Sequence, residues 1–110
     1  MFRPLPSQEE LHTLFEYSPT TGLFTYKTKP NQKIKIGSIA GSINKNGYRL
    51  IQVNKRSYKA SRLVWMYVHG EDPGNLTVDH IDRNKANDAI DNLRLATKQQ
   101  QQFNRSGWNS

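Results

Sequence analysis

The stretch that decides the fold reads LTVDHIDRNKANDAIDNLRLAT and spans residues 76–97. Apolar residues at 76, 78 and 81, and again at 93 and 95, have the spacing of two short strands. Between them lies a polar stretch rich in Asn and Asp, which favour turns. Thr97 is a suitable cap for a closing helix that runs on from Lys98. The stretch therefore predicts a strand, a loop, a strand and a helix in succession.

Upstream of this unit the sequence predicts a helix and a small sheet. Ser7 and Glu10 have the spacing of a capping box, and the apolar residues that follow predict a helix over about 8–16. Residues 23–27 are typical of a strand, and isoleucines among glycines suggest another over 34–39.

The next segment predicts a hairpin followed by a helix. Residues 47–53 and 57–60 flank a polar turn and should pair as antiparallel strands. Ser61 would then cap a helix that Gly70 ends in the left-handed conformation. The expected fold is α+β, with a small antiparallel sheet lobe and short helices over 1–70 and the strand-loop-strand-helix unit over 71–110.

The size and charge of the chain limit the classes of function that it can have. A chain of 110 residues forms one small domain, which excludes a multidomain enzyme. Its 16 Lys and Arg against 9 Asp and Glu give a net charge of +7, which favours polyanionic partners. The absence of Cys excludes disulfides and thiol chemistry. With no signal peptide or apolar membrane span evident, the expectation is a cytoplasmic protein, in the host cell if phage-encoded.

The basic residues are unevenly distributed. Residues 17–70 contain ten Lys and Arg and no Asp or Glu. Such a segment suits a surface that follows the phosphates of a nucleic acid. Within this segment, the side chains expected to contact a nucleic acid are Arg49, Lys55, Arg56, Lys59 and Arg62.

The Asp79-His80 pair, the Asn-Leu-Arg of residues 92–94 and the Asn-Arg of residues 104–105 resemble the HNH endonucleases, in particular the small phage and homing type. The resemblance covers roughly residues 17–105. It implies a ββα-metal active site at the C-terminal unit. It also implies an enzyme that hydrolyses phosphodiester bonds of double-stranded DNA by nicking or double-strand cleavage.

The resemblance assigns roles to individual side chains. His80 would be the general base that takes a proton from the attacking water. Asn92 would brace the loop that holds His80. Asp79 would bind one divalent metal ion, expected to be Mg²⁺ with Mn²⁺ able to substitute, through a local distortion of its strand. The second ligand position of the family falls on Gln101, and Asn104, one helical turn later, is the alternative. Arg94 and Arg105 would contact the DNA, together with the basic side chains of residues 17–70.

The departure at Gln101 leaves other readings open. One alternative is a DNA-binding protein that keeps the HNH fold with weakened catalysis. A less favoured one is a basic RNA-binding domain, for which no RNA-binding signature is present. The expected partner is double-stranded DNA, with no membrane and no obligate protein partner, and the chain is expected to act as a monomer or weak dimer.

Overall fold

The computed structural model describes residues 5–29 and 31–97. The chain begins with α1 (Gln8–Leu14), whose first turn is capped because the Ser7 hydroxyl accepts a hydrogen bond from the Glu10 amide at 3.0 Å. The cap at Ser7 is confirmed, whereas the Glu10 carboxylate accepts a hydrogen bond from the Asn54 side chain at 2.9 Å. The helix ends earlier than expected. Phe15 leaves the helix and begins β1 (Phe15–Ser18), which pairs antiparallel with β2 (Leu23–Tyr26). Strand pairing thus overrides helical periodicity at this point.

A three-stranded sheet follows. Its strands are β3 (Ser42–Ile43), β4 (Arg49–Val53) and β5 (Arg56–Lys59), in the order β3-β4-β5. The expected hairpin is confirmed, with a two-residue turn in which Asn54 and Lys55 have φ of 52° and 66°. The strand expected over 34–39 is absent: this segment consists of turns, with one bridge between Thr25 and Ile39.

The central helix is α2 (Ala60–His69), which Gly70 ends at a φ of 71°, as expected. Ser61 does not cap it. The helix begins two residues earlier, with Lys59 at the cap position, and Ser61 is buried in its first turn. A difference of two residues is an ordinary error at helix ends.

The C-terminal unit contains β6 (Thr77–His80), the short 3-10 helix η1 (Ile90–Asn92) and β7 (Leu93–Ala96). β6 and β7 pair antiparallel, with His80 opposite Leu93. The predicted strand, loop and strand are thus confirmed. The closing helix expected after Thr97, with Gln101, Asn104 and Arg105, lies outside the described residues.

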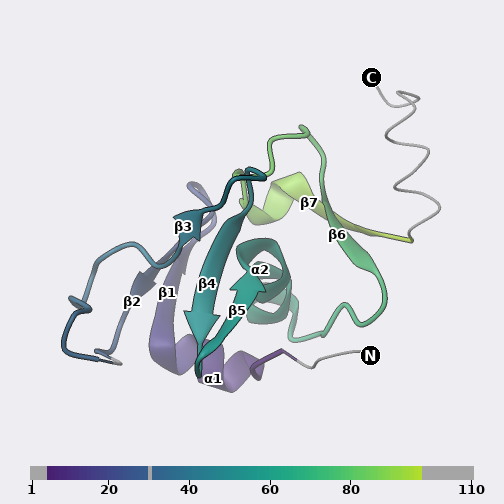
Figure 1. Cartoon of the computed structure of the whole chain (residues 1–110). Helices are drawn as coiled ribbons and strands as arrows, with labels where there is room; N and C mark the ends of the chain where they lie inside the picture. The colour runs from purple at the N-terminus through teal and green to yellow at the C-terminus, as the bar shows by residue number, and fades with distance from the viewer. Residues whose placement is uncertain (1–4, 30, 98–110) are drawn as a thin grey trace.

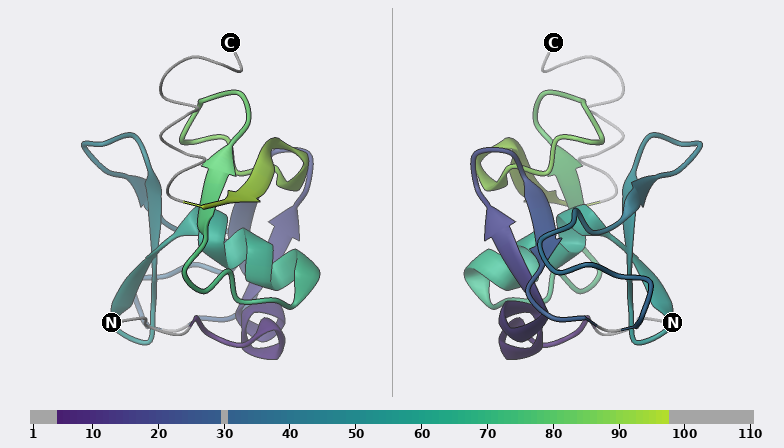
Figure 2. Two further views of the ribbon diagram at one scale, coloured as in Figure 1. Left: turned by 90° about the vertical axis from the view of Figure 1, so that its right-hand side faces the viewer. Right: turned by 90° about the vertical axis from the view of Figure 1, so that its left-hand side faces the viewer.

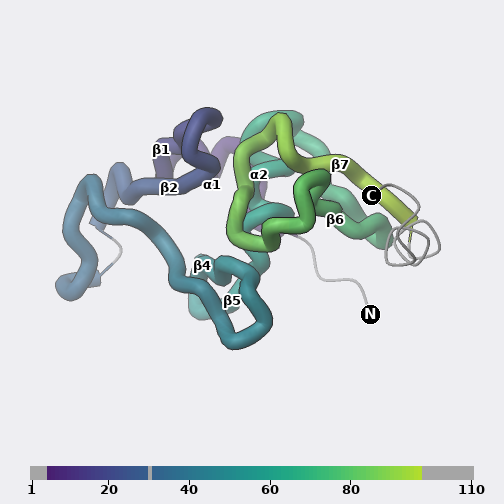
Figure 3. The backbone as a smooth tube through the Cα atoms, turned by 90° about the horizontal axis from the view of Figure 1, so that it is seen from above, coloured from purple at the N-terminus to yellow at the C-terminus, as the bar shows by residue number. Residues whose placement is uncertain are grey.

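The core gathers around α2, which contacts α1, β4, β5, β6 and η1. The largest fully buried apolar side chains are Phe15, Phe24, Leu11, Ile51, Leu63 and Val64. In Figures 1 and 2, α2 lies in the middle of the elements that surround it. Seen from above in Figure 3, α2 lies between the β1–β2 pair and the β6–β7 pair. None of the described helices has the length and apolar character needed to span a membrane.

Candidate active site

His80 and Asp88 form a buried pair at the end of β6. The His80 Nε2 atom lies 2.8 Å from Asp88 Oδ1, and the two side chains are only 5% and 2% exposed. His80 is the last residue of its strand, whereas Asp88 comes from the loop that connects β6 to η1. A buried carboxylate requires polar partners, and here a ring nitrogen of His80 serves as one.

Two residues of the β1–β2 hairpin support the backbone at Asp88. The Tyr17 hydroxyl donates to the Asp88 carbonyl at 2.7 Å, and burial raises the pKa of this hydroxyl to about 12. Gly22, with a φ of 73°, approaches so closely that a Cβ there would lie 2.3 Å from the Ala89 nitrogen. The N-terminal hairpin therefore positions the loop that carries Asp88.

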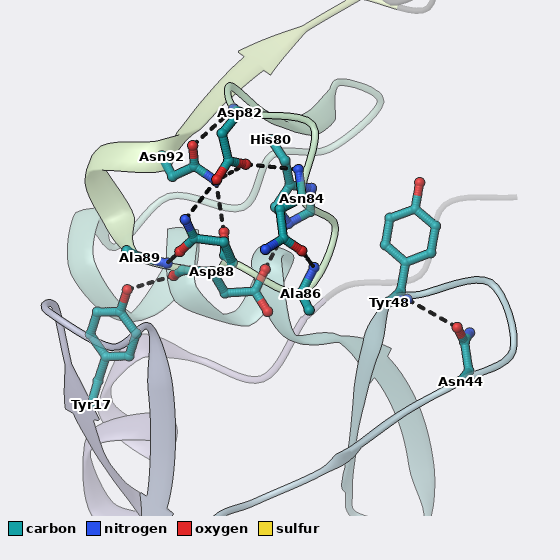
Figure 4. A network of polar contacts seen from close by, with 11 residues as sticks. Tyr17, Asn44, Tyr48, His80, Asp82, Asn84, Ala86, Asp88, Ala89 and Asn92 are labelled. Atoms are coloured by element: carbon teal, nitrogen blue, oxygen red, sulfur yellow. Dashed lines mark hydrogen bonds and ion pairs between the residues drawn. The ribbon is translucent and has the colours of Figure 1, made fainter.

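Asn92 closes the same loop from its other end. Its side-chain oxygen accepts from the Asp82 amide at 3.0 Å, and its Nδ2 donates to Asp82 Oδ1 and to the Asn87 carbonyl, both at 2.9 Å. Its backbone carbonyl accepts from the Ile81 amide at 2.8 Å. These contacts join the two ends of the loop directly after His80 (Figure 4).

Asp82, like Asn92, is a residue of the loop at which several hydrogen bonds meet. It accepts from the Asn87 side chain at 2.9 Å, from the Asn84 amide at 2.8 Å and from the Asn92 side chain at 2.9 Å. These hydrogen bonds, the one from Asn87 foremost, hold the pKa of the Asp82 carboxyl below its usual value. Asp82 stays exposed to solvent, so the loop has a polar outer face and a buried inner one at Asp88.

Asp79 lies on the other face of β6 from His80. The register of β6 with β7 runs without interruption from Thr77 to His80, so neighbouring side chains alternate between faces. The distortion that the family resemblance implies therefore does not occur within β6. Asp79 pairs across the strands with Arg94, with 3.6 Å between Asp79 Oδ2 and Arg94 Nη2.

The chemistry of Asp79 suits a divalent cation. Mg²⁺ takes oxygen ligands and keeps several waters, so one or two protein ligands suffice. Among the described residues there is no group of three or more His, Asp or Glu side chains that could hold a metal. Asp79 is thus a fitting single donor, and Gln101 and Asn104 lie beyond the part of the chain that is described.

The basic side chains expected to contact DNA fall into two groups. The first group already forms bonds within the protein. Arg49 donates to the Gly41 carbonyl at 3.0 Å, and Arg62 donates to the carbonyls of Gly74 and Leu76, both at 3.0 Å. Arg94 belongs with this group through its ion pair with Asp79. The second group is exposed on the β4–β5 hairpin and consists of Lys55, Arg56 and Lys59, while Arg105 lies outside the described residues.

Sequence reasoning missed Asp88, Asp82 and Tyr17. Their signal was weak, because a loop rich in Asn and Asp is explained by turn formation alone. Asp88 between Asn87 and Ala89 carries no periodic pattern that would indicate burial. Tyr17 was assigned no role at all, since its partner lies 71 residues away along the chain.

Known proteins that are similar to this chain include HNH endonucleases. Residues 58–103 match a family model described as HNH endonuclease. An uncharacterized HNH endonuclease of Acanthamoeba polyphaga mimivirus is 38% identical over 65 residues, covering 58% of this chain and 34% of that protein. Protein 3.8 of Escherichia phage T7 is 45% identical over 53 residues, covering 46% of this chain and 44% of that protein. The chain thus spans less than half the length of these relatives.

A solved structure shares the fold. The HNH homing endonuclease I-HmuI, whose structure is described as showing DNA binding and cleavage, matches with a TM-score of 0.65 and 24% sequence identity. The match covers 93% of this chain and 57% of that one. The α+β fold expected from the sequence is therefore confirmed. Taken with the sequence matches, it shows that this chain is similar to the HNH endonucleases, most clearly over residues 58–103.

Proposed function

We propose that this chain hydrolyses phosphodiester bonds of double-stranded DNA, with His80 as the general base. The observation that supports this most is the buried contact between His80 Nε2 and Asp88 Oδ1 at 2.8 Å. A catalytic base must be held in one orientation, and a buried hydrogen bond to one ring nitrogen does so. The contact therefore gives His80 the fixed orientation that a general base needs.

The hydrogen bond between His80 and Asp88 also determines which ring nitrogen of His80 can act as the base. An ionised carboxylate only accepts hydrogen bonds, so the proton of the neutral imidazole resides on Nε2, which donates to Asp88. The lone pair is then on Nδ1, and this is the atom that takes the proton from water. When the ring becomes positively charged, the Asp88 carboxylate stabilises the new charge.

Asn92 acts as a positioning residue in this proposal. It ties Asp82 and Asn87 together, and these residues lie on either side of the loop between His80 and Asp88. The loop therefore keeps Asp88 in place beneath His80. The role is a structural one and involves no contact between Asn92 and the substrate.

Asp79 would hold one divalent metal ion, Mg²⁺ or Mn²⁺, with Gln101 or Asn104 as a further ligand. The metal would stabilise the negative charge that develops on the phosphate and on the leaving oxygen. Because Arg94 Nη2 lies 3.6 Å from Asp79 Oδ2, Arg94 balances the Asp79 charge before the metal binds.

The net charge of +7 supports DNA as the substrate. Of the expected contacts, Lys55, Arg56 and Lys59 are exposed and available to phosphates, and Arg94 and Arg105 remain part of the proposal. Arg49 and Arg62 have guanidinium groups that already donate to backbone carbonyls. We therefore assign these two a smaller share of the DNA affinity.

The experiment that tests the proposal uses supercoiled plasmid with Mg²⁺, with Mn²⁺ and with EDTA. The wild-type chain should produce relaxed or linear DNA only with metal, and His80→Ala should lose the activity. His69→Ala is the matched control, because His69 is an exposed histidine at the end of α2. If the wild type binds DNA without cleaving it in either metal, the chain is a DNA-binding protein on the HNH fold and the proposal is wrong.

A further inference from the structure

Two lysine ammonium groups from separate parts of the chain lie over one aromatic ring. Lys59 Nζ is 4.0 Å from the centroid of the Tyr48 ring, and Lys85 Nζ is 5.0 Å from the same centroid. Lys59 ends β5, whereas Lys85 belongs to the loop after β6. Figure 4 shows the Tyr48 ring across from Asn84 and Ala86 of that loop.

The two positive charges are not neutralised by the protein. Neither lysine forms an ion pair with a carboxylate in the part of the chain that the structure describes. Burial and the charges of Arg62 and Lys85 lower the pKa of Lys59. The face of the Tyr48 ring offsets the repulsion, through the attraction of its π electrons for cations. Lys85 also donates to the Asn46 carbonyl at 3.3 Å, which fixes its position.

The cluster lies next to the candidate base. The ring centroids of Tyr48 and His80 are 6.2 Å apart. Successive phosphates on one DNA strand follow each other at about 3.4 Å along the helix axis. A strand whose scissile phosphate reaches His80 therefore has a neighbouring phosphate within reach of these two ammonium groups.

We propose that Tyr48, Lys59 and Lys85 form a phosphate clamp that binds a backbone phosphate of the substrate DNA beside the scissile one. The ring contacts both ammonium groups, and a phosphate oxygen that accepts hydrogen bonds from both offsets part of their combined charge. Since Lys59 and Lys85 come from different segments, binding also ties the loop after β6 to the three-stranded sheet. This proposal rests on the proposed function, because it assumes a DNA substrate, but it does not require that the chain cleaves the DNA.

The test measures affinity for a short DNA duplex by fluorescence anisotropy in EDTA, over a series of salt concentrations. Lys59→Gln and Lys85→Gln should each weaken binding, and the double variant should reduce the slope of log affinity against log salt by about 0.9, the contribution of one phosphate. Lys33→Gln is the matched control. Lys33 is exposed, and the loop around residue 33 lies on the far side of the molecule from β6 and β7 (Figures 1 and 3).

Tyr48 is tested separately, because its variants keep both charges. Tyr48→Phe retains the ring and should bind as the wild type does, whereas Tyr48→Leu should bind several-fold more weakly. Thermal unfolding of each variant checks that the fold is kept. The clamp is wrong if the double lysine variant keeps the wild-type salt slope, or if Lys33→Gln reduces it equally. If the variants lose DNA affinity as expected but the wild type does not cleave plasmid, the clamp proposal holds and the nuclease proposal is wrong.

Discussion

At the scale of single residues, the orientation of His80 depends on one carboxylate. Replacing Asp88 by Leu removes the acceptor for His80 Nε2 and leaves a buried ring nitrogen without a partner. We expect a loss of about 1–3 kcal/mol in the free energy of unfolding, together with a large loss of cleavage. Asp88→Asn keeps the shape and an amide oxygen that can accept, so it should keep the fold and recover part of the activity.

Two measurements separate positioning from simple stability in these variants. Long-range proton-nitrogen NMR reports which nitrogen of His80 carries the proton, and the wild type should show it on Nε2. DNA affinity in EDTA should be the same for Asp88→Asn and the wild type, while the turnover rate at saturating DNA falls. A proton found on Nδ1 in the wild type would contradict the proposed role of Asp88.

The sequence predicted His80, Asn92 and Asp79 as candidates only through the family resemblance of their spacing. It could not predict Asp88, because burial of a carboxylate depends on long-range packing that no local pattern records. The pairing of Asp79 with Arg94 was likewise not foreseen. It follows from the β6–β7 register, which places these residues opposite each other.

At the scale of elements, the β1–β2 hairpin and the loop after β6 are in contact through a glycine. Gly22→Ala would introduce a methyl group 2.3 Å from the Ala89 nitrogen, at a φ of 73° that disfavours side chains. We expect a loss of at least about 2 kcal/mol in the free energy of unfolding, and weaker cleavage because the Asp88 backbone moves.

Gly74→Ala is the control for Gly22→Ala. Gly74 has a φ of 63°, and a methyl group added there would meet nothing within 4 Å, so this variant carries the backbone strain without the contact. Its loss should be about 1 kcal/mol, with cleavage unchanged. Urea denaturation of both variants gives the comparison, and equal losses would show that the hairpin does not support the loop.

The Tyr17 hydroxyl makes a second contact between these elements, and its ionisation gives a pH-dependent test. Because burial raises its pKa from 10.0 to about 12, the folded state favours the neutral hydroxyl. This contribution is fully present below pH 10, and it is lost as the pH rises toward 12, since the unfolded chain ionises first. Tyr17→Phe should cost about 1 kcal/mol at about pH 8, and its deficit should shrink by about pH 11. A deficit that stays constant over this range would contradict the assignment.

The sequence predicted most elements, and its errors fall at the N-terminal hairpin, over residues 34–39 and at the start of α2. Apolar residues through Phe15 continue the helical spacing of α1, but Phe15 and Tyr17 alternate as in a strand and pair with β2. A segment this short fits both the helical and the strand periodicity, so only its pairing with β2 determines which structure forms. The isoleucines at 36 and 39 suggested a strand, yet their side chains are 66% and 54% exposed.

At the scale of the whole molecule, the C-terminal unit packs its apolar side chains against α2. α2 contacts β6 and η1, and Leu93 and Ala96 of β7 are buried. The unfolding cooperativity of the chain should therefore come from one apolar core. The sequence predicted the order of the elements in the parts over 1–70 and 71–110. It did not predict that these parts meet at α2, because that contact depends on which face of the helix is buried.

Removal of the divalent metal should then separate activity from stability. The described core consists of apolar side chains, and Asp79 already has Arg94 to balance its charge, so the folded state does not need the cation. We expect EDTA to abolish plasmid cleavage and to leave the thermal unfolding midpoint within about 1 °C, in contrast to small domains that fold only around a structural metal. Saturating Mg²⁺ should restore cleavage, and it should raise the midpoint only modestly through mass action. Calorimetry with and without EDTA measures both effects. A midpoint that falls by many degrees in EDTA would show that the metal is structural, and that Asp79 binds it to stabilise the fold rather than to support cleavage.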